Sequence, residues 1–272
     1  MIKINGTIII EPKQFPDGTL LLKFDKEQFD LRSTIAYEWN YESDAELFTL
    51  ICIAKHYNYP GMELYLPYIP HARMDRVKSD EDVFTLKYFA EVINSLNFKI
   101  VWVRDAHSNV SLALIDNVCD TGVKAYIRKA IELSGANAMF YPDEGAMKRY
   151  SSESELPYAF GMKKRDWKTG KIEGLDIINT DNIVGKDVLI VDDICSRGGT
   201  FYHSAKALKA AGAKGVSLYI THCEETITLG ELAASDGLVD HVYTTRSIFP
   251  EKLVKSEHGY DPYWKEWITI LD

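Results

Sequence analysis

The sequence lacks the patterns of a secreted or membrane protein. It has only four cysteines (Cys52, Cys119, Cys195 and Cys223), which are far apart and form no Cys-x-x-Cys pair. Such cysteines indicate free thiols in a reducing cytosol. No apolar run approaches the ~20 residues of a membrane span, and the first residues lack the charged-then-apolar order of a signal peptide. We therefore predict a cytoplasmic protein that does not bind membranes.

Basic residues are also in deficit. The 272 residues include 31 Lys and Arg against 40 Asp and Glu, which gives a net charge of -9 and a pI of about 5.3. Affinity for a nucleic-acid backbone comes from clustered basic side chains, so this composition argues against a nucleic-acid binder. The chain has neither a Walker A sequence nor a GxGxxG sequence. Any ATP must therefore bind outside a P-loop, held by a few placed cations, backbone amides and a metal.

The apolar pattern predicts alternating strands and helices. The expected strands are 7–11, 20–24, 62–66, 99–103, 138–141, 158–162, 187–191, 215–221 and 241–244, and the expected helices are 43–57, 79–96, 123–133, 201–211 and 226–234. Such alternation is typical of parallel sheets with right-handed crossovers. We predict an α/β fold of two doubly wound, mainly parallel-sheet domains, residues 1–120 and 121–272, with the site between them. The last residues are expected to pack back on the N-terminal domain.

The most informative stretch is residues 188–200. Four apolar residues, 188–191, predict a buried parallel strand, and Asp192 and Asp193 follow where that strand should end. A short loop then leads into a helix, and it consists of Ser196, Arg197, Gly198, Gly199 and Thr200. Backbone amides in such a loop, with the helix N-terminus, form an anion cradle. Two carboxylates beside it suit ribose hydroxyls or a magnesium ion that bridges to phosphate. The alternative is a simple acidic strand end with a glycine-rich turn.

Two further clusters follow expected strands in the first half. After 62–66, Arg73 and Arg76 could form a fork for a polyphosphate, with Asp75 orienting one of them; a surface ion pair is the alternative. After 99–103, Asp105 precedes His107, and a histidine beside an acid at a strand end could bind a metal. A lone histidine is more often structural.

Three more segments have weaker signals taken singly. Asp143 lies in a Pro-Asp segment that is also typical of an ordinary turn. Lys163 and Arg165 belong to a basic run, 163–171, of the kind that usually forms a solvated loop. Phe15 and Asp17 lie in a segment, 15–19, whose proline and Asp-Gly predict a hairpin turn.

Taken in order, these segments resemble the ribose-phosphate diphosphokinases, also called phosphoribosyl diphosphate (PRPP) synthetases, from about residue 15 to about residue 250. The loop at 196–200 alone also resembles type I phosphoribosyltransferases, which share the fold. The segments around Arg73–Arg76 and Asp105–His107 resemble only the synthetases.

The resemblance implies roles for the residues named above. His107 would bind the magnesium that accompanies ATP, supported by Asp105, and Asp143 would be a second metal ligand or a ribose contact. Lys163 and Arg165 would close over the transferring phosphates. Phe15 and Asp17 would contact the adenine of ATP bound mainly by a neighbouring subunit, which implies a homo-oligomer of at least two chains. Thr19 replaces the family's glutamate there.

The expected function is the magnesium-dependent transfer of the β,γ-diphosphoryl group of ATP to the anomeric hydroxyl of ribose 5-phosphate, with release of AMP. Where the family usually has Asp-Thr-Ala-Gly, this chain has Ser196, Arg197, Gly198 and Gly199, so its cradle is about two charges more positive. This change could also suit a substituted phosphate, so ADP-ribose is an alternative acceptor; if Arg197 points to solvent, ribose 5-phosphate is the substrate. A PRPP-consuming phosphoribosyltransferase and a non-catalytic paralogue are further alternatives.

Overall fold

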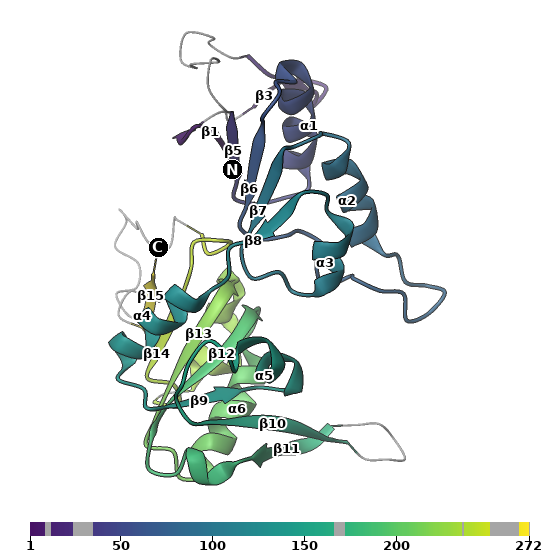
Figure 1. Ribbon diagram of the computed structural model, residues 1–272. Coiled ribbons are helices and arrows are strands. Elements are labelled where there is room, and N and C mark those ends of the chain that lie inside the picture. Colours follow the sequence, from purple (N-terminus) through teal and green to yellow (C-terminus); the bar gives the residue numbers. More distant parts are fainter. Residues whose placement is uncertain (9–11, 24–34, 166–171, 236, 251–266, 272) are drawn as a thin grey trace. The chain divides into compact units, whose positions relative to one another are not determined.

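The computed structural model describes residues 1–8, 12–23, 35–165, 172–235, 237–250 and 267–271 (Figure 1). The chain divides into two compact units, Met1–Gly122 and Val123–Asp272. Each unit contains one large, mainly parallel sheet. The predicted α/β class with mainly parallel sheets is thus confirmed. None of the helices in the described ranges has the length and apolar character needed to cross a membrane, and all four cysteines are free.

The first unit contains a six-stranded sheet in the order β2-β1-β5-β6-β7-β8. Strands β5 to β8 are parallel, whereas β1 is antiparallel to both of its neighbours. The elements of this unit are β1 (Ile2–Ile4), β2 (Thr7–Ile8), β3 (Lys13–Gln14), β4 (Leu20–Leu21), β5 (Ala36–Trp39), α1 (Ala45–Tyr57), β6 (Glu63–Leu66), α2 (Thr85–Asn94), β7 (Ile100–Val103), α3 (Asn109–Leu114) and β8 (Val118–Asp120).

One face of this sheet forms the core of the first unit. Alternate strand residues are buried, because successive side chains of a strand point to opposite faces. Leu64 and Val101 are fully buried in one apolar cluster with Leu50 of α1 and Phe89 of α2. Figure 1 shows the helices α1, α2 and α3 on the same side of the strands.

The opposite face is more open, and Trp102 lies there stacked on Tyr65 with ring centres 5.9 Å apart. The indole nitrogen of Trp102 donates to Glu63 at 2.9 Å.

The N-terminal strands pair differently from the prediction. Thr7 pairs with Ile4 of β1, and the turn between them is Asn5-Gly6, both with positive φ. Asn-Gly is the sequence that favours such two-residue hairpins. The hairpin predicted around residues 15–19 is present, but its strands are the short β3 and β4.

The second unit contains a seven-stranded sheet in the order β11-β10-β9-β12-β13-β14-β15. All neighbouring pairs are parallel except the antiparallel hairpin of β10 and β11. Its elements are α4 (Lys124–Ser134), β9 (Ala138–Tyr141), α5 (Glu144–Tyr150), β10 (Tyr158–Arg165), β11 (Ile172–Ile178), the 3-10 helix η2 (Thr180–Asn182), β12 (Asp187–Cys195), α6 (Gly199–Ala210), β13 (Gly215–Cys223), the 3-10 helix η3 (Glu225–Leu229), α7 (Glu231–Ala234), β14 (His241–Thr244) and β15 (Ile268–Ile270).

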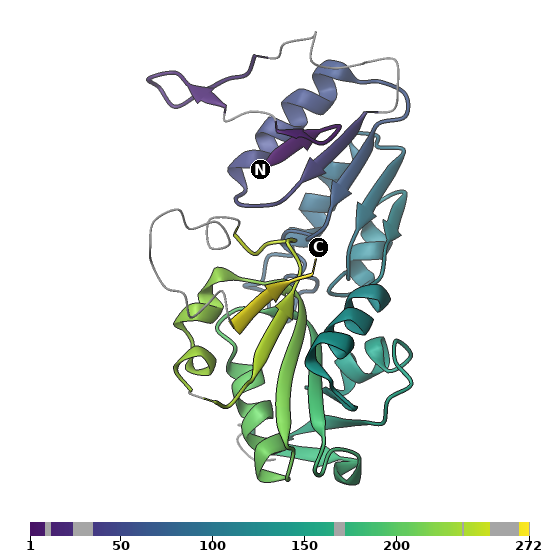
Figure 2. The same cartoon turned by 90° about the vertical axis from the view of Figure 1, so that its left-hand side faces the viewer.

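Both faces of the second sheet are covered by helices, as Figure 2 shows. Val188 and Ile190 of β12 pack with Leu208 of α6 in one apolar cluster. Leu189 and Val191 pack with residues of α4 and α5 in another. Strand β12 is therefore buried on both faces, as its continuous apolar run predicted.

Three further boundaries differ from the prediction. Strand β12 continues to Cys195 because β13 is equally long and pairs with it as far as Cys223, so the two acids lie inside the strand. The helix expected at 226–234 is divided into η3 and α7 by Gly230, whose backbone is extended. The helix expected from residue 79 begins at Thr85, since the carboxylate of Asp82 accepts the backbone N–H groups of residues 78 and 79 in a separate turn.

The end of the described chain lies in the second sheet. Strand β15 pairs with β14, Val242 opposite Ile268, whereas the sequence placed the last residues on the N-terminal domain.

Candidate active site

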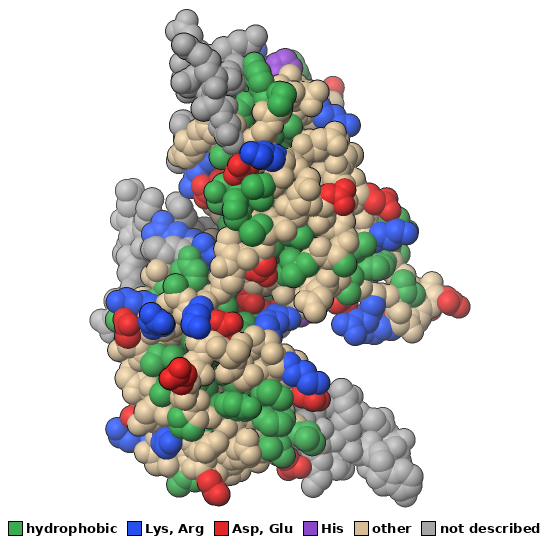
Figure 3. Space-filling model, viewed as in Figure 1, with side chains coloured by type: hydrophobic (Ala, Val, Ile, Leu, Met, Phe, Trp, Pro, Cys, Tyr) green, Lys and Arg blue, Asp and Glu red, His purple; other side chains and the backbone are tan. Residues whose placement is uncertain are grey.

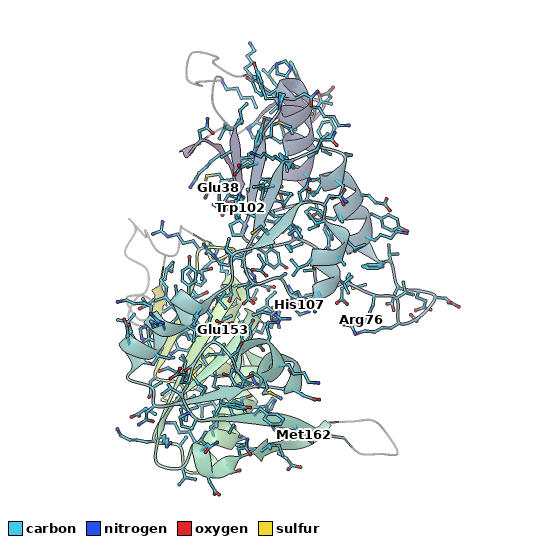
Figure 4. The ribbon with its side chains drawn as sticks, in the orientation of Figure 1. Glu38, Arg76, Trp102, His107, Glu153 and Met162 are labelled. Atoms are coloured by element: carbon cyan, nitrogen blue, oxygen red, sulfur yellow. The ribbon has the colours of Figure 1, made fainter. Side chains whose placement is uncertain are left out.

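In the first unit, the loops that follow β6 and β7 bring three of the predicted residues together. The backbone N–H of Arg104 donates to the carbonyl of Pro67 at 3.3 Å and joins the two loops. Asp75 is buried, and its two carboxylate oxygens accept Nε and Nη2 of Arg76 at 2.8 and 3.2 Å. The Arg76 side chain remains 66% exposed. Figure 4 shows Arg76 and His107 on the loops of this unit.

The charge on Asp75 is stabilised by these neighbours. The hydrogen bond from Arg76 lowers the pKa of Asp75, and the electrostatic interaction with His107 acts in the same direction. Burial opposes this effect but does not outweigh it. His107 therefore lies within electrostatic reach of the Asp75–Arg76 pair, and the exposed guanidinium of Arg76 keeps donors for an anion.

Asp120, which no motif of the sequence indicated, shapes the loop that carries His107. Its carboxylate accepts the backbone N–H groups of Asp105 and Ala106, both at 3.0 Å, and of Gly122 at 2.9 Å. Asp105 is buried with a φ of 51°, a left-handed conformation that aspartate tolerates better than most residues. The Thr-Gly pair after Asp120 is a turn signal that could have drawn attention to this acid.

The other predicted residues of the first unit have more exposed positions. The side chain of Arg73 is exposed, and Phe15 is 49% exposed at the tip of the hairpin. The carboxylate of Asp17 accepts the backbone N–H of Thr19 at 3.0 Å and its hydroxyl at 2.7 Å, so it closes the hairpin turn.

In the second unit, the predicted anion loop joins β12 to α6. Gly198 has a φ of 77° and directly precedes the helix, which begins at Gly199. This conformation suits glycine and turns the chain sharply. The backbone N–H groups of the first turn of α6 have no partners within the helix, so this end of α6 favours an anion. Ser196 is partly exposed, and Arg197, Gly199 and Thr200 are exposed.

The segment of η3 and α7 supports this loop from behind. A Cβ atom on Gly230 would lie 1.7 Å from the carbonyl oxygen of Arg197, and one on Gly198 would lie 3.0 Å from Leu232. The hydroxyl of Ser196 lies 3.2 Å from that of Thr226. These close approaches fix the path of the loop.

The two acids of β12 lie beside this loop. Asp193 is buried and Asp192 is partly exposed, and the backbone N–H of Asp193 donates to the Asp192 carboxylate at 2.9 Å. Burial raises the pKa of Asp192, and the adjacent charge of Asp193 raises it further. Arg149, a residue that the sequence motifs did not indicate, has its Nη1 3.3 Å from Asp193 Oδ2.

Asp143 is brought into the electrostatic field of the same acids. It is the N-cap of α5, and its carboxylate accepts the backbone N–H of Ala146 at 3.0 Å. Its negative charge is a further cause of the raised pKa of Asp192. Sequence reasoning placed Asp143 in a turn but did not expect the helix behind it.

Lys163 and Arg165 lie near the end of β10, opposite Leu175 and Ile172 of β11. Their side chains are outside the described part of the chain, as are residues 166–171 of the basic run. On the face seen in Figure 3, basic and acidic side chains are interspersed rather than gathered in one field.

The two residues predicted as metal ligands are His107, which lies in the first unit, and Asp143, which lies in the second. Among the described residues, no three His, Cys, Asp or Glu side chains are placed to hold an ion together. Mg²⁺ is typically held by one or two carboxylates, waters and substrate phosphates. Asp143 offers a carboxylate oxygen of the kind that Mg²⁺ prefers, and His107 offers a ring nitrogen.

Comparison with known proteins finds similarity to the same family that the motifs resemble. No protein-family model matches the chain. The chain is 28% identical over 222 residues to the ribose-phosphate pyrophosphokinase of Saccharolobus solfataricus, a match that covers 78% of this chain and 76% of that protein. It is 28% identical over 255 residues to the enzyme of the same name from Mycoplasma pneumoniae, covering 88% of this chain and 76% of the relative.

The fold comparison covers nearly the whole chain. The crystal structure of phosphoribosylpyrophosphate synthetase from Mycobacterium smegmatis superposes with a TM-score of 0.74 at 17% identity, over 98% of this chain and 86% of that one. The resemblance to the ribose-phosphate diphosphokinase family, which the motifs predicted, is therefore confirmed in sequence and in fold.

Proposed function

We propose that this protein is a ribose-phosphate diphosphokinase, which transfers the β,γ-diphosphoryl group of ATP to the anomeric hydroxyl of a 5-phosphorylated ribose and releases AMP. The names of the relatives support this activity. The observation that carries it is the last part of β12, where Asp192 and Asp193 lie shortly before an anion loop that contains Gly198 and packs against Gly230.

The second unit binds the acceptor in this proposal. The 5-phosphate of ribose 5-phosphate binds the loop residues Ser196, Arg197, Gly198, Gly199 and Thr200, through backbone amides and the start of α6. The ribose hydroxyls donate to Asp192 and Asp193. Asp143 contacts the ribose or the metal.

The first unit binds ATP. Arg73 and Arg76 bind its phosphates, and Asp75 holds the Arg76 guanidinium in place. His107 contributes a ligand to the magnesium of the nucleotide. Phe15 and Asp17 of a neighbouring subunit contact the adenine, so the active form is a homo-oligomer.

In the reaction, the anomeric oxygen attacks the β-phosphorus in line, and its proton is released to solvent. The bond from the β-phosphorus to the oxygen that bridges to the α-phosphorus breaks, and AMP leaves with that oxygen. Lys163 and Arg165 offset the charge on the transferring phosphates, which is most of what phosphoryl transfer requires of a protein. Mg²⁺, when bound, adds to this charge neutralisation.

ADP-ribose is the second candidate acceptor. Arg197 stands in the anion loop with its side chain exposed, and the loop has one base more and one acid less than the family's usual sequence. An added guanidinium suits the second phosphate of a diphosphate. The transfer would be the same, and the product would be ADP-ribose with a diphosphate at the anomeric position.

The test is to incubate the protein with ATP and Mg²⁺ and to offer ribose 5-phosphate or ADP-ribose separately, following AMP release and product mass. AMP with ribose 5-phosphate is the expected result. AMP mainly with ADP-ribose would make Arg197 a determinant of specificity, which an Arg197→Ala variant would confirm by losing that preference. No AMP with either acceptor would contradict the proposal and favour a phosphoribosyltransferase or a non-catalytic paralogue.

A further inference from the structure

Arg149, in the last turn of α5, forms an ion pair with one of the two acids of β12. Its Nη1 lies 3.3 Å from Asp193 Oδ2, and the Asp193 side chain is only 7% exposed. The Arg149 side chain is 32% exposed, so the pair lies in a partly buried environment. Such a pair is stronger than one in water, and loss of one partner leaves the other charge buried.

Arg149 is itself held by a core residue. Its Nη1 donates to the hydroxyl of Tyr150 at 3.3 Å, and its guanidinium carbon lies 5.6 Å from the centre of the Tyr150 ring. Tyr150 is buried, and its carbonyl accepts the hydroxyl of Tyr141 at 3.2 Å. The position of the guanidinium is therefore set by the core of the second unit.

Helix α5 acts on the two acids of β12 from both of its ends. Asp143, at its N-cap, adds negative charge near Asp192 and helps to raise the pKa of that residue. Arg149, near its other end, places positive charge beside Asp193. The helix thus treats the two neighbouring carboxyl groups differently.

This difference has a chemical consequence for a sugar ligand. Two adjacent carboxylates repel each other, and one of them takes up a proton more readily unless a cation is near. A fixed, ionised carboxylate accepts a hydrogen bond from a hydroxyl more strongly than a neutral carboxyl does. The cation beside Asp193 therefore bears directly on how well this acid binds a ribose hydroxyl.

We infer that Arg149 is a positioning residue, which holds Asp193 as a fixed carboxylate that accepts hydrogen bonds from the ribose hydroxyls of the acceptor. This inference rests on the proposed function. It predicts that loss of the guanidinium weakens binding of the acceptor and leaves the binding of ATP unchanged.

The test compares Arg149→Gln and Arg149→Lys with wild type in the full-length protein. Lys148→Gln is the matched control, because it removes one positive charge from the residue that precedes Arg149. The Nζ of Lys148 lies 2.7 Å from Glu144 in an exposed surface pair. KM and kcat are measured for ATP and for whichever of ribose 5-phosphate and ADP-ribose the wild type uses, and calorimetry measures acceptor binding without turnover.

We expect Arg149→Gln to raise the KM and the Kd of the acceptor about tenfold or more, equivalent to about 1.4 kcal/mol. The KM for ATP should stay within about twofold, and Arg149→Lys should recover part of the lost affinity because it restores the charge without the planar fork. Lys148→Gln should resemble the wild type in both constants.

Acceptor affinity that is unchanged in both Arg149 variants would overturn the inference and leave the proposed function intact. Equal losses for ATP and acceptor, or a lysine variant no better than the glutamine variant, would also overturn it by indicating a general structural role. If Arg149→Gln does not fold, the lysine variant decides by its Kd for the acceptor. A wild-type protein that binds and uses neither acceptor would contradict the proposed function, and this inference with it.

Discussion

Asp75 is buried, and it accepts two hydrogen bonds from Arg76, the residue that follows it in the chain. The bidentate contact fixes the base of an otherwise exposed guanidinium, since a carboxylate matches the geometry of its paired N–H groups. A cation held in this way is ready for a polyphosphate without the entropy loss of ordering a free side chain.

Asp75→Asn should therefore reduce stability in a pH-dependent manner. Arg76 lowers the pKa of Asp75 in the folded state, so the carboxylate stabilises the fold above its ordinary pKa near 4, and this contribution is lost as the pH falls through the lowered value. Because Arg76 is largely exposed and screened by solvent, we expect a loss of about 1 kcal/mol or less at pH 7.

Urea unfolding at pH 7 and at pH 3 measures this effect, with the exposed neighbour Asp80→Asn as the control. The difference in the free energy of unfolding between wild type and Asp75→Asn should be smaller at the lower pH. A gap of equal size at both values would show that the lowered pKa does not contribute.

Asp120→Asn should loosen the loop that carries His107. The carboxylate accepts hydrogen bonds from three backbone N–H groups. The asparagine side chain has only one oxygen acceptor, and its NH₂ group is a donor that cannot bond to the remaining N–H groups. We expect the free energy of unfolding to fall by about 1–2 kcal/mol. Hydrogen exchange should become faster at the N–H groups of Asp105, Ala106 and Gly122. Asp116→Asn, an exposed acid of the same unit, is the control. Unaltered exchange at those amides would contradict the role given to Asp120.

Gly230→Ala should distort the anion loop. The new Cβ would lie 1.7 Å from the carbonyl oxygen of Arg197, which is too close for two non-bonded atoms, so the backbone of one segment must move. If the loop binds the acceptor phosphate as proposed, the KM for the acceptor should rise by about tenfold or more, equivalent to about 1.4 kcal/mol, with little change in the KM for ATP. Leu229→Ala, which shortens the 74% exposed side chain next to Gly230, should leave both constants near wild type. An unchanged acceptor KM in Gly230→Ala would show that the loop does not contribute to acceptor binding.

Asp192→Asn should increase stability at alkaline pH. Burial and the charge of Asp193 raise the pKa of Asp192, so the native state holds a proton that the unfolded state has already lost, and stability falls as the pH rises from about 4 to the raised value. Asparagine carries no charge and keeps a carbonyl oxygen for the N–H of Asp193.

Thermal melts at pH 5 and pH 8 test this expectation. We expect the free energy of unfolding of the variant to exceed that of wild type by about 1 kcal/mol or more at pH 8, since one pKa unit corresponds to about 1.4 kcal/mol. This gain in stability should be smaller at pH 5. Asp181→Asn, an exposed acid, is the control. A gain that is the same at both values would argue against a raised pKa.

Those parts of the candidate site whose residues are contiguous in the chain could be predicted from the sequence. The two acids and the glycine-rich loop follow one apolar run, so the sequence predicted a strand, a loop and a helix in this order, although β12 extends to Cys195 and α6 begins at Gly199. The helix expected at 123–133 is likewise present as α4, which ends at Ser134 and is followed by Gly135 in the left-handed conformation that favours glycine at such a position.

Contacts between distant segments could not be predicted in this way. Strand β12 extends past its apolar run because β13, which is formed by later residues, pairs with it as far as Cys223. Arg149 belongs to a helix that the sequence did not indicate, and only the packing of α5 against β12 brings it to Asp193. The sequence placed Gly230 inside an expected helix, and its close approach to Arg197 is visible only in three dimensions.

The sequence by itself determined the α/β class, the family resemblance and the residue types of the candidate site, because strand and helix periods, turn residues and contiguous motifs are local properties of the chain. Tertiary structure decided which charged and polar groups interact. Asp75 and His107, Asp120 and Asp105, and Arg149 and Asp193 are separated by 32, 15 and 44 positions in the sequence. Coulombic and hydrogen-bond energies depend on distance in space, so the lowered pKa of Asp75 and the ion pair of Asp193 follow from the fold that brings these partners together.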